Sequence, residues 1–341
     1  MKTTLCTLYN SLYLDKGLVL YDSLKENAKD FELYVLCMDD KCFEVLSTIK
    51  EEELKPIRLE KVENEEMLEA KSNRTTAEYC WTCSSRLIQY ILDEYQPECC
   101  TYIDADMYFY HDPQILIDEM LDAGKSVMMV PHRFTESNIY LAEKVGTYCV
   151  EFNTFRNDVN GLKVLNHWHS KCLECCSNLG DGIHWGDQKY MDEWPDLFSE
   201  IVHICQNVGA GIAPWNIEAY RDYDDNNGSI RYESGCTSSI VFFHYASLTY
   251  RSRRLIDTGI VCTSNLNYKL VESLYQSYLL KIDKKKENIY LNYGIDTLIK
   301  KHPSAIGQLT LRQRITSSYL GVFIRSLFPR MNEGHSYIVR L

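Results

Sequence analysis

Apolar runs of strand length alternate with stretches of helical spacing over the first 60 residues. The strand-like runs are Thr3 to Leu8, Phe31 to Met38 and Ile57 to Leu59. Between them, apolar residues recur at helical spacing, first at Leu14, Leu18, Tyr21 and Leu24 and then at Phe43, Val45, Leu46 and Ile49. Strands and helices that alternate in this way build parallel sheets with helical crossovers. The pattern therefore predicts an α/β fold with a mostly parallel central sheet.

The same alternation continues to about residue 250. A long amphipathic helix is predicted from Thr75 to Tyr95, and the apolar run Cys99 to Ile103 follows it as a buried strand. Further strands are predicted over 126–130, 148–155, 201–205 and 239–243, and helices after Pro113 and over 161–176 and 189–194. Residues 220–235 are polar and are predicted to form a loop. From residue 265 the pattern is helical, so we expect an α/β domain over residues 1–255 and a helical, basic C-terminal extension over residues 256–341.

The composition is that of an ordinary globular protein. Hydrophobic residues make up 45% of the 341 residues, and charged residues make up 25%. No apolar run reaches the roughly 18 residues that a membrane-spanning helix needs. The N-terminus lacks the charged and apolar regions of a secretory signal. We therefore expect a cytoplasmic protein.

Charge is unevenly distributed along the chain. The net charge of −12 argues against a general nucleic-acid-binding protein. Residues 281–341, however, hold 11 basic and 4 acidic residues. Within them, residues 309–330 mix arginines with apolar side chains, as in a basic amphipathic helix that lies on an anionic membrane. The alternative, a helix that packs on the body of the protein, explains the same pattern equally well.

Fourteen cysteines are many for a chain of this length. Without a secretory signal, free thiols are expected rather than disulfides. Cys80 and Cys83 have redox spacing, and Cys172, Cys175 and Cys176 could surround a zinc ion. Both groups lie in helical patterns, where cysteine packs as a small apolar residue, so packing is the better interpretation.

Two carboxylates, Asp104 and Asp106, follow directly after the predicted buried strand Cys99 to Ile103. Ligands of open α/β sheets bind at the carboxyl ends of the strands. Two such carboxylates can share one hard divalent cation and leave other coordination positions free for phosphate oxygens. The motif therefore predicts a site for a metal ion and a diphosphate, and a nucleotide-sugar is the leading candidate ligand.

Two further residues could belong to this site. His244 ends the predicted strand 239–243 and could be a third metal ligand, with Mn²⁺ suiting imidazole better than Mg²⁺. A strand-end histidine bonded to a backbone carbonyl is an equally good interpretation. Asp187 precedes the predicted helix 189–194, where it could cap the helix or point its carboxylate into a cleft.

Other nucleotide-binding signatures are absent or incomplete. The glycine-rich segment 207–211 lacks the third glycine of a dinucleotide fingerprint, because Pro214 stands there, and no P-loop sequence occurs. Lys71 and Arg74, before the long helix, could pair with a phosphate or be solvated surface charges. These observations argue against a nicotinamide-dependent dehydrogenase.

The order of these motifs resembles that of the GT-A glycosyltransferases, and of their retaining family-8 type in particular, over residues 3 to 250. Thr101 to Asp106 resembles the metal motif of that family, and Phe152-Asn153-Thr154 resembles its asparagine segment near the donor sugar. Gly186-Asp187-Gln188 resembles its Asp-Gln pair beside the reacting carbon. Phe243-His244-Tyr245 resembles the segment that supplies its third metal ligand.

The chain also departs from that family. The small residues expected after the asparagine are replaced by Thr154 and Phe155. The Lys-Pro-Trp sequence that often follows the histidine is missing, so a diphosphate contact is expected from one of the arginines nearby, Arg251, Arg253 or Arg254.

The resemblance implies a transferase that uses a nucleotide-sugar, UDP-linked in the first instance, and retains the anomeric configuration. Asp104, Asp106 and His244 would hold Mn²⁺ or Mg²⁺, with Asp187 and Gln188 near the anomeric carbon. Donor contacts are expected from Thr7, Tyr9, Asp39, Arg74, Ala105 and Asn153, and acceptor contacts from His132 and Trp215. A glycan or lipid-linked acceptor of the cell envelope would suit a membrane-bound extension. Alternatives are a sugar-nucleotidyltransferase and a non-catalytic protein that binds sugar nucleotides.

Overall fold

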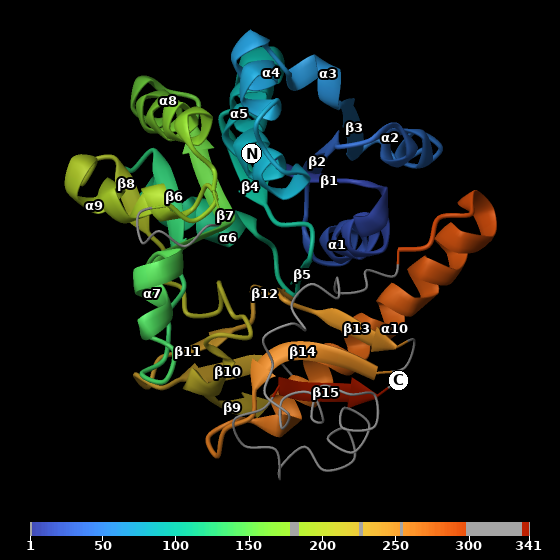
Figure 1. Cartoon of the computed structure of the whole chain (residues 1–341). Helices are drawn as coiled ribbons and strands as arrows, with labels where there is room; N and C mark the ends of the chain where they lie inside the picture. The colour runs from blue at the N-terminus through green and yellow to red at the C-terminus, as the bar shows by residue number, and fades with distance from the viewer. Residues whose placement is uncertain (1, 178–183, 225–227, 253–254, 298–335, 341) are drawn as a thin grey trace.

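The computed structural model describes residues 2–177, 184–224, 228–252, 255–297 and 336–340 (Figure 1). A seven-stranded sheet with the order β3-β2-β1-β4-β7-β6-β8 forms its centre. Every strand runs parallel to its neighbours except β7, which is antiparallel to both β4 and β6. The seven strands are β1 (Thr3–Tyr9), β2 (Phe31–Cys37), β3 (Leu54–Arg58), β4 (Cys99–Ile103), β6 (Val127–Pro131), β7 (Tyr148–Arg156) and β8 (Val202–Ile204). The predicted α/β fold with a mostly parallel sheet is confirmed.

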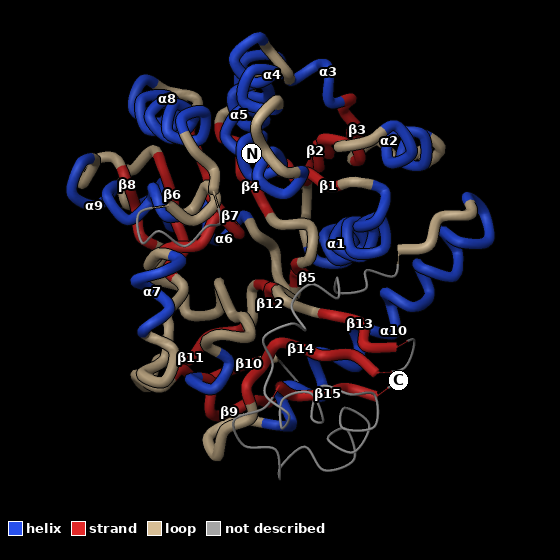
Figure 2. Tube along the Cα trace, in the orientation of Figure 1, coloured by secondary structure: helices blue, strands red, loops and turns tan. Residues whose placement is uncertain are grey.

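Helices cover both faces of this sheet (Figure 2). On one face, α1 (Leu14–Asn27), α2 (Asp40–Ser47) and α6 (Gln114–Asp122) bury apolar residues against alternate strand positions such as Leu5. The other face is covered by α3 (Leu59–Val62), α4 (Glu65–Lys71), α5 (Thr76–Tyr95), α8 (Val159–Glu174) and α9 (Trp194–Leu197), which pack on intervening positions such as Cys6. Because the strands are buried on both sides, they are almost continuously apolar in sequence.

The helix α5 begins where the sequence predicts. The Thr75 hydroxyl accepts a hydrogen bond from the Glu78 backbone N–H (3.3 Å), and the Glu78 carboxylate accepts one from the Thr75 N–H (2.9 Å). This reciprocal capping box satisfies two N–H groups that a helix start otherwise leaves unpaired. The short helix α7 (Tyr140–Val145) lies apart from the two faces, between β6 and β7 in the chain.

A second group of strands lies below the central sheet in Figure 1. The strand β12 (Phe242–His244) pairs with β5 (Met107–Phe109), which continues the chain from β4. Two three-stranded sheets adjoin this pair. They consist of β9 (Tyr220–Asp224), β10 (Ser229–Tyr232) and β11 (Thr237–Ser239), and of β13 (Thr249–Ser252), β14 (Leu255–Val261) and β15 (Ser336–Arg340).

The structure corrects three predicted elements. Residues 220–235, predicted as a loop, contain the antiparallel strands β9 and β10, whose partly exposed faces account for their polar sequence. The predicted strand 239–243 divides into the end of β11 and the start of β12. The strand predicted over 57–59 is β3, which begins at Leu54 and tolerates Pro56 because it is an edge strand.

The C-terminal segment packs on the body of the protein through the helix α10 (Tyr268–Tyr293). Lys281 and Lys285 form ion pairs with Glu26 and Asp22 of α1, each with an N–O distance of 2.7 Å. Part of the basic charge noted in the sequence is therefore paired with α1. The strands β14 and β15 also belong to the segment predicted as helical, and the boundary after residue 255 remains a prediction.

The predicted amphipathic helix over 309–330 lies outside the described residues, so membrane binding by this segment remains a prediction. In the described part of the chain, no helix combines the length and apolar character needed to cross a membrane. All fourteen cysteines are free thiols, and eleven of them are buried, which agrees with packing as their main use.

The first turn of α1 lies directly against the end of β1. A Cβ atom at Gly17 would overlap the ring of Tyr9, so only glycine allows the helix and the tyrosine to approach this closely. Tyr9 itself is buried at the carboxyl end of β1. This contact sets how the start of α1 sits beside the ends of the central strands.

We therefore predict that Gly17→Ala destabilises the fold by about 1–3 kcal/mol, the usual cost of overpacking a core. Thermal unfolding should show a melting temperature lower by a few degrees, as expected for a domain of this size. Lys25→Ala in the same helix, where the side chain is exposed, serves as the control and should change little. Equal melting temperatures for Gly17→Ala and the wild type would contradict the contact described above.

Candidate active site

Asp104, Asp106 and His244 converge at the carboxyl end of β4. His244 ends β12 and stands opposite Met107 in the antiparallel pair with β5, so the register brings it beside the residue before Met107. Its Nε2 lies 3.1 Å from Asp106 Oδ1 and 3.6 Å from Asp104 Oδ2. One ligand atom from each of the three side chains can lie within 4.8 Å of the others. The convergence that the sequence predicts is therefore present in the structure.

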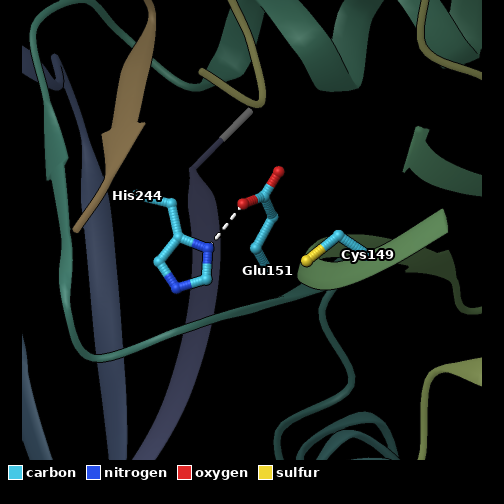
Figure 3. A group of neighbouring side chains, drawn as sticks. All are labelled: Cys149, Glu151 and His244. Carbon is cyan, nitrogen blue, oxygen red and sulfur yellow. Dashed lines mark hydrogen bonds and ion pairs between the residues drawn. The ribbon is translucent and has the colours of Figure 1, made fainter. Parts of the chain in front are cut away.

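Glu151 holds the opposite edge of the same imidazole ring (Figure 3). Its Oε2 lies 2.6 Å from His244 Nδ1, and the Glu151 side chain is completely buried in β7. With the proton of a neutral imidazole on Nδ1, that nitrogen donates to Glu151 and Nε2 keeps its lone pair for the side of Asp104 and Asp106. Cys149, two residues earlier in β7, lies near the same carboxylate and ring.

Sequence analysis missed Glu151 as a member of the site. The signal was present, because a carboxylate in the β-rich run 148–155 is expensive to bury and needs a partner. What the sequence could not show is that the partner comes from a strand about ninety residues later, since this depends on how β7 lies beside β4 and β12.

Charges within the cluster are strongly coupled. Burial alone would lower the pKa of His244, but the charge of Asp106 and the hydrogen bonds to Asp106, Cys149 and Glu151 hold it well above its usual value. Burial raises the pKa of Asp104 to about 6, with His244 opposing this shift and the negative charges of Asp106 and Glu151 adding to it. Burial also favours a raised pKa for Asp106, but the adjacent His244 outweighs it and lowers that pKa.

This donor set fits a divalent cation. Two carboxylates and an imidazole supply oxygen and nitrogen ligands, and the buried Glu151 orients the imidazole. The side chains of Asp104 and Asp106 are 30% and 20% exposed, so a cation there would remain open to a ligand from solvent. The imidazole favours Mn²⁺ over Mg²⁺.

Asp187 lies in the turn that precedes a 3₁₀ segment (Lys189–Glu193). Its backbone carbonyl accepts a hydrogen bond from Trp168 Nε1 at 2.8 Å, which anchors the turn on α8. The segment has Gln188 at its N-cap position and no side-chain capping bond, so Asp187 does not act as a cap. Its Oδ2 is buried and has no hydrogen-bond partner among the described residues. Burial raises the pKa of Asp187 to about 7, with the nearby Ser84 hydroxyl opposing and the charge of Asp104 adding to the shift.

The other predicted catalytic residue, Gln188, is held by the backbone. Its Nε2 donates to the Val145 carbonyl at 2.7 Å, at the end of α7. This bond fixes the side chain beside Asp187 and leaves its oxygen as an acceptor. A catalytic role for the pair remains a prediction.

The two predicted acceptor residues form a wall beside the cluster. The ring of Trp215 lies edge-on to the ring of His244, with centroids 5.5 Å apart. Trp215 Nε1 donates to the His132 carbonyl at 2.9 Å, and the two rings also meet edge to face. His132 is buried, and burial lowers its pKa to about 3, so it is neutral. Trp215 is therefore the more accessible of the two for an acceptor.

Four of the predicted donor residues lie in or directly after the central strands β1, β4 and β7. Thr7 and Asn153 are completely buried in β1 and β7, and Thr7 Oγ1 and Asn153 Oδ1 lack hydrogen-bond partners among the described residues. Ala105 is buried between the two aspartates, and the ring of Tyr9 packs on Gly17. Unpaired buried acceptors at a sheet edge are compatible with a ligand that would satisfy them.

Two other predicted donor residues make structural contacts. Asp39 accepts hydrogen bonds from the Cys42 N–H at 2.8 Å, which caps α2, and from the Ser11 N–H at 3.0 Å. Arg74 donates to the Cys172 and Leu173 carbonyls at 2.6 Å, which satisfies the end of α8. Donor binding by Asp39 and Arg74 remains a prediction, and the structure gives each of them another function.

The raised pKa of Asp187 predicts a pH-dependent cost in stability. Between about pH 4 and pH 7 the unfolded chain ionises this group while the folded protein keeps the proton, so stability falls as the pH rises through this window. The full shift corresponds to a cost on the order of 1–4 kcal/mol at pH 8. Asp187→Asn cannot ionise, so in chelator-treated protein it should raise the melting temperature at pH 8 and leave it unchanged at pH 4. Asp196→Asn, at an exposed position, is the control, and a gain of the same size at both pH values would refute the explanation.

Comparison with known proteins places the chain in a family. No protein-family model matches it. The Bacillus subtilis (strain 168) protein YfnF, described as uncharacterized, is 30% identical over 285 residues, which cover 82% of this chain and 92% of YfnF. YfnD from the same organism, also described as uncharacterized, is 29% identical over 246 residues, which cover 71% of this chain and 77% of YfnD.

A solved structure shows the same fold. An active-site mutant of LgtC superposes with a TM-score of 0.50 at 13% identity, over 73% of this chain and 90% of LgtC. The galactosyltransferase LgtC in complex with donor and acceptor sugar analogues gives a TM-score of 0.49 at 14% identity, over 72% and 87% of the two chains. Sequence identities this low support a shared fold but do not establish a shared activity. The chain therefore belongs to the same family as YfnF and YfnD, and its fold is the GT-A fold of the glycosyltransferases, as in the family-8 enzyme LgtC.

Proposed function

We propose that the protein is a metal-dependent glycosyltransferase. It moves a sugar from a nucleotide-sugar, with a UDP-sugar as the first candidate, to a hydroxyl of a glycan or lipid-linked acceptor, with retention of the anomeric configuration. The observation that carries the proposal is the convergence of Asp104, Asp106 and His244 at the carboxyl end of β4. The GT-A fold supports it, because this edge of the sheet is where ligands of open α/β folds bind.

The reaction breaks the bond between the anomeric carbon and a diphosphate oxygen, and the bonding electrons leave with that oxygen. The acceptor hydroxyl oxygen forms the new bond to the same carbon, and its proton passes to the released diphosphate or to water. Asp104, Asp106 and His244 would hold Mn²⁺ or Mg²⁺, which when bound neutralises the charge that develops on the leaving diphosphate. An acidic protein with a net charge of −12 needs such a device to bind an anionic donor.

Residues of the chain itself account for the remaining steps. Glu151 fixes the ring of His244, so the imidazole does not have to be ordered when the donor binds. Asp187 in its ionised form would stabilise positive charge at the anomeric carbon, as carboxylates do in sugar-transfer chemistry. Because the pKa of Asp187 is about 7, this contribution should increase as the pH rises through neutrality. Trp215 offers an aromatic face for an acceptor sugar.

The proposal is tested with purified protein, Mn²⁺ and a panel of nucleotide-sugars, in which release of the nucleoside diphosphate is measured. Asp104→Asn and Asp106→Asn should each reduce turnover by about 100-fold or more, because metal ligands contribute several kcal/mol to the transition state. Asp122→Asn in α6, at an exposed position, is the matched control and should retain full activity. Turnover that survives complete chelation would contradict metal dependence. Turnover that requires added pyrophosphate and yields a nucleoside triphosphate and a sugar 1-phosphate would favour a sugar-nucleotidyltransferase.

Glu151→Gln tests the orientation of His244 directly. Loss of the buried carboxylate should weaken Mn²⁺ binding by about 10- to 100-fold, the usual effect of changing the partner of a metal-ligating histidine. Saturating Mn²⁺ should restore most of the turnover, since the ligands themselves remain. Calorimetric or electron-paramagnetic-resonance titration measures the affinity. An unchanged Mn²⁺ affinity would show that Glu151 has only a structural role.

A further inference from the structure

Lys16 is a buried lysine that forms no ion pair with any of the described residues. It lies in the first turn of α1 and is only 5% exposed. Its Nζ sits 3.9 Å from the centre of the Tyr13 ring, and the described residues provide it with no carboxylate in ion-pair range and no hydrogen-bond acceptor. Lysines are almost never buried to this extent unless they are paired, because removal of an ammonium group from water is costly.

The position of Lys16 places its charge beside the candidate cation site. β1 and β4 are parallel neighbours, so their carboxyl ends share one edge of the sheet, and α1 starts at this edge. The charge of Lys16 reaches Asp106 and helps to lower the pKa of that carboxyl group. The ring of Tyr13 lies against the Lys16 ammonium group. Burial raises the pKa of Tyr13, and the negative charges of Asp106 and Asp104 add to this shift. The close packing of Gly17 on Tyr9 fixes this turn of α1 in place.

Two arginines that the sequence suggests as phosphate ligands are already paired. Arg251 binds Asp257, with Nε 3.1 Å from Oδ2, and Arg74 binds the carbonyls at the end of α8. Of the three arginines expected to contact the diphosphate, Arg253 and Arg254 lie outside the described residues. Lys16 thus differs from Arg74 and Arg251 in having a charge that is buried next to the site and forms no ion pair with the described residues, although the carboxyl groups of Asp15 and Asp106 interact with it at longer range.

The charges of the site require a second positively charged group beside the metal ion. A divalent cation held by two carboxylates has no net positive charge left for a donor, and the buried carboxylate of Glu151 adds a further negative charge. The diphosphate of a nucleotide-sugar carries two negative charges and gains another when the sugar leaves. A second cation near the metal would offset that charge, and lysine supplies it to phosphate groups as a point charge.

We infer that Lys16 binds the diphosphate of the nucleotide-sugar donor and stabilises the nucleoside diphosphate as it leaves. This inference rests on the proposed function and adds a specific contact to it. The ammonium on the Tyr13 ring is held in a position that bulk water barely reaches, so its interaction with a phosphate oxygen is stronger than that of an exposed lysine.

The test compares Lys16→Met and Lys16→Arg with the wild type in calorimetric titrations with Mn²⁺ and a panel of nucleoside diphosphates that includes UDP. The matching nucleosides, such as uridine, serve as ligands without phosphate. Lys16→Met should bind the diphosphate about 10- to 100-fold more weakly, as expected for a lost hydrogen bond to a charged group, and bind the nucleoside as the wild type does. Lys16→Arg should retain most of the affinity. Lys25→Met, in the same helix and paired with Glu51 at 2.8 Å, is the matched control and should be unchanged.

The outcomes separate the inference from the proposed function. If the wild type binds none of the diphosphates, the proposed function fails and the inference fails with it. If the wild type binds one of them and Lys16→Met binds it equally well, the inference is overturned and the transferase proposal stands. Equal losses of affinity for the diphosphate and for the nucleoside would show that Lys16 has only a structural role, and this result would also overturn the inference. Melting temperatures measured without ligand show whether each variant is folded. If Lys16→Met is unfolded, Lys16→Gln serves as the second neutral variant.

Discussion

The ring of His244 is shared between two sets of carboxylates, and the candidate site depends on this arrangement. Glu151 binds one ring nitrogen from inside the protein, and Asp106 and Asp104 face the other from the solvent side. Without a metal ion, the protonated ring supplies the positive charge that these acids require. A cation in the same place would displace that proton, because imidazole binds metals in its neutral form. The fold thus keeps four ionisable groups together at a sheet edge by allowing a proton and a metal ion to substitute for one another.

The buried acids of this region also show a conflict between stability and chemistry. Asp187 has a buried oxygen without a partner among the described residues, and its pKa is shifted close to neutrality. In the same described part of the chain, Thr7 in β1 and Asn153 in β7 have similar unpaired oxygens. A fold selected only for stability would pair or replace such groups. Their concentration near the carboxyl ends of β1 and β4 and the adjoining part of β7 marks the part of the molecule where a polar ligand would recover the lost hydrogen bonds.

The sequence predicts the parts of this site that depend on local pattern. Asp104 and Asp106 follow an apolar run that could only be a buried strand, and the order of the motifs suggested that His244 lies nearby. Glu151 and Lys16 escaped notice because each becomes informative only through its surroundings. The carboxylate of Glu151 has a distant histidine as its partner, and the ammonium of Lys16 lies on the Tyr13 ring with no ion pair to the described residues. The polar hairpin of β9 and β10 and the strand β15 were missed for a related reason. Their pairing partners are chosen by tertiary contacts, which periodicity does not record.

Two stacked tyrosines connect the C-terminal helix α10 to the strand that carries His244. Tyr245, next in the chain to His244, lies parallel to Tyr278 of α10 with ring centres 3.6 Å apart, and its hydroxyl donates to the Leu274 carbonyl at 3.0 Å. Removal of α10 would leave this aromatic surface bare and release the strand that carries the imidazole. The helix therefore supports the strand end that carries the candidate site, and shortening the chain ahead of it would disturb that site as well as the fold.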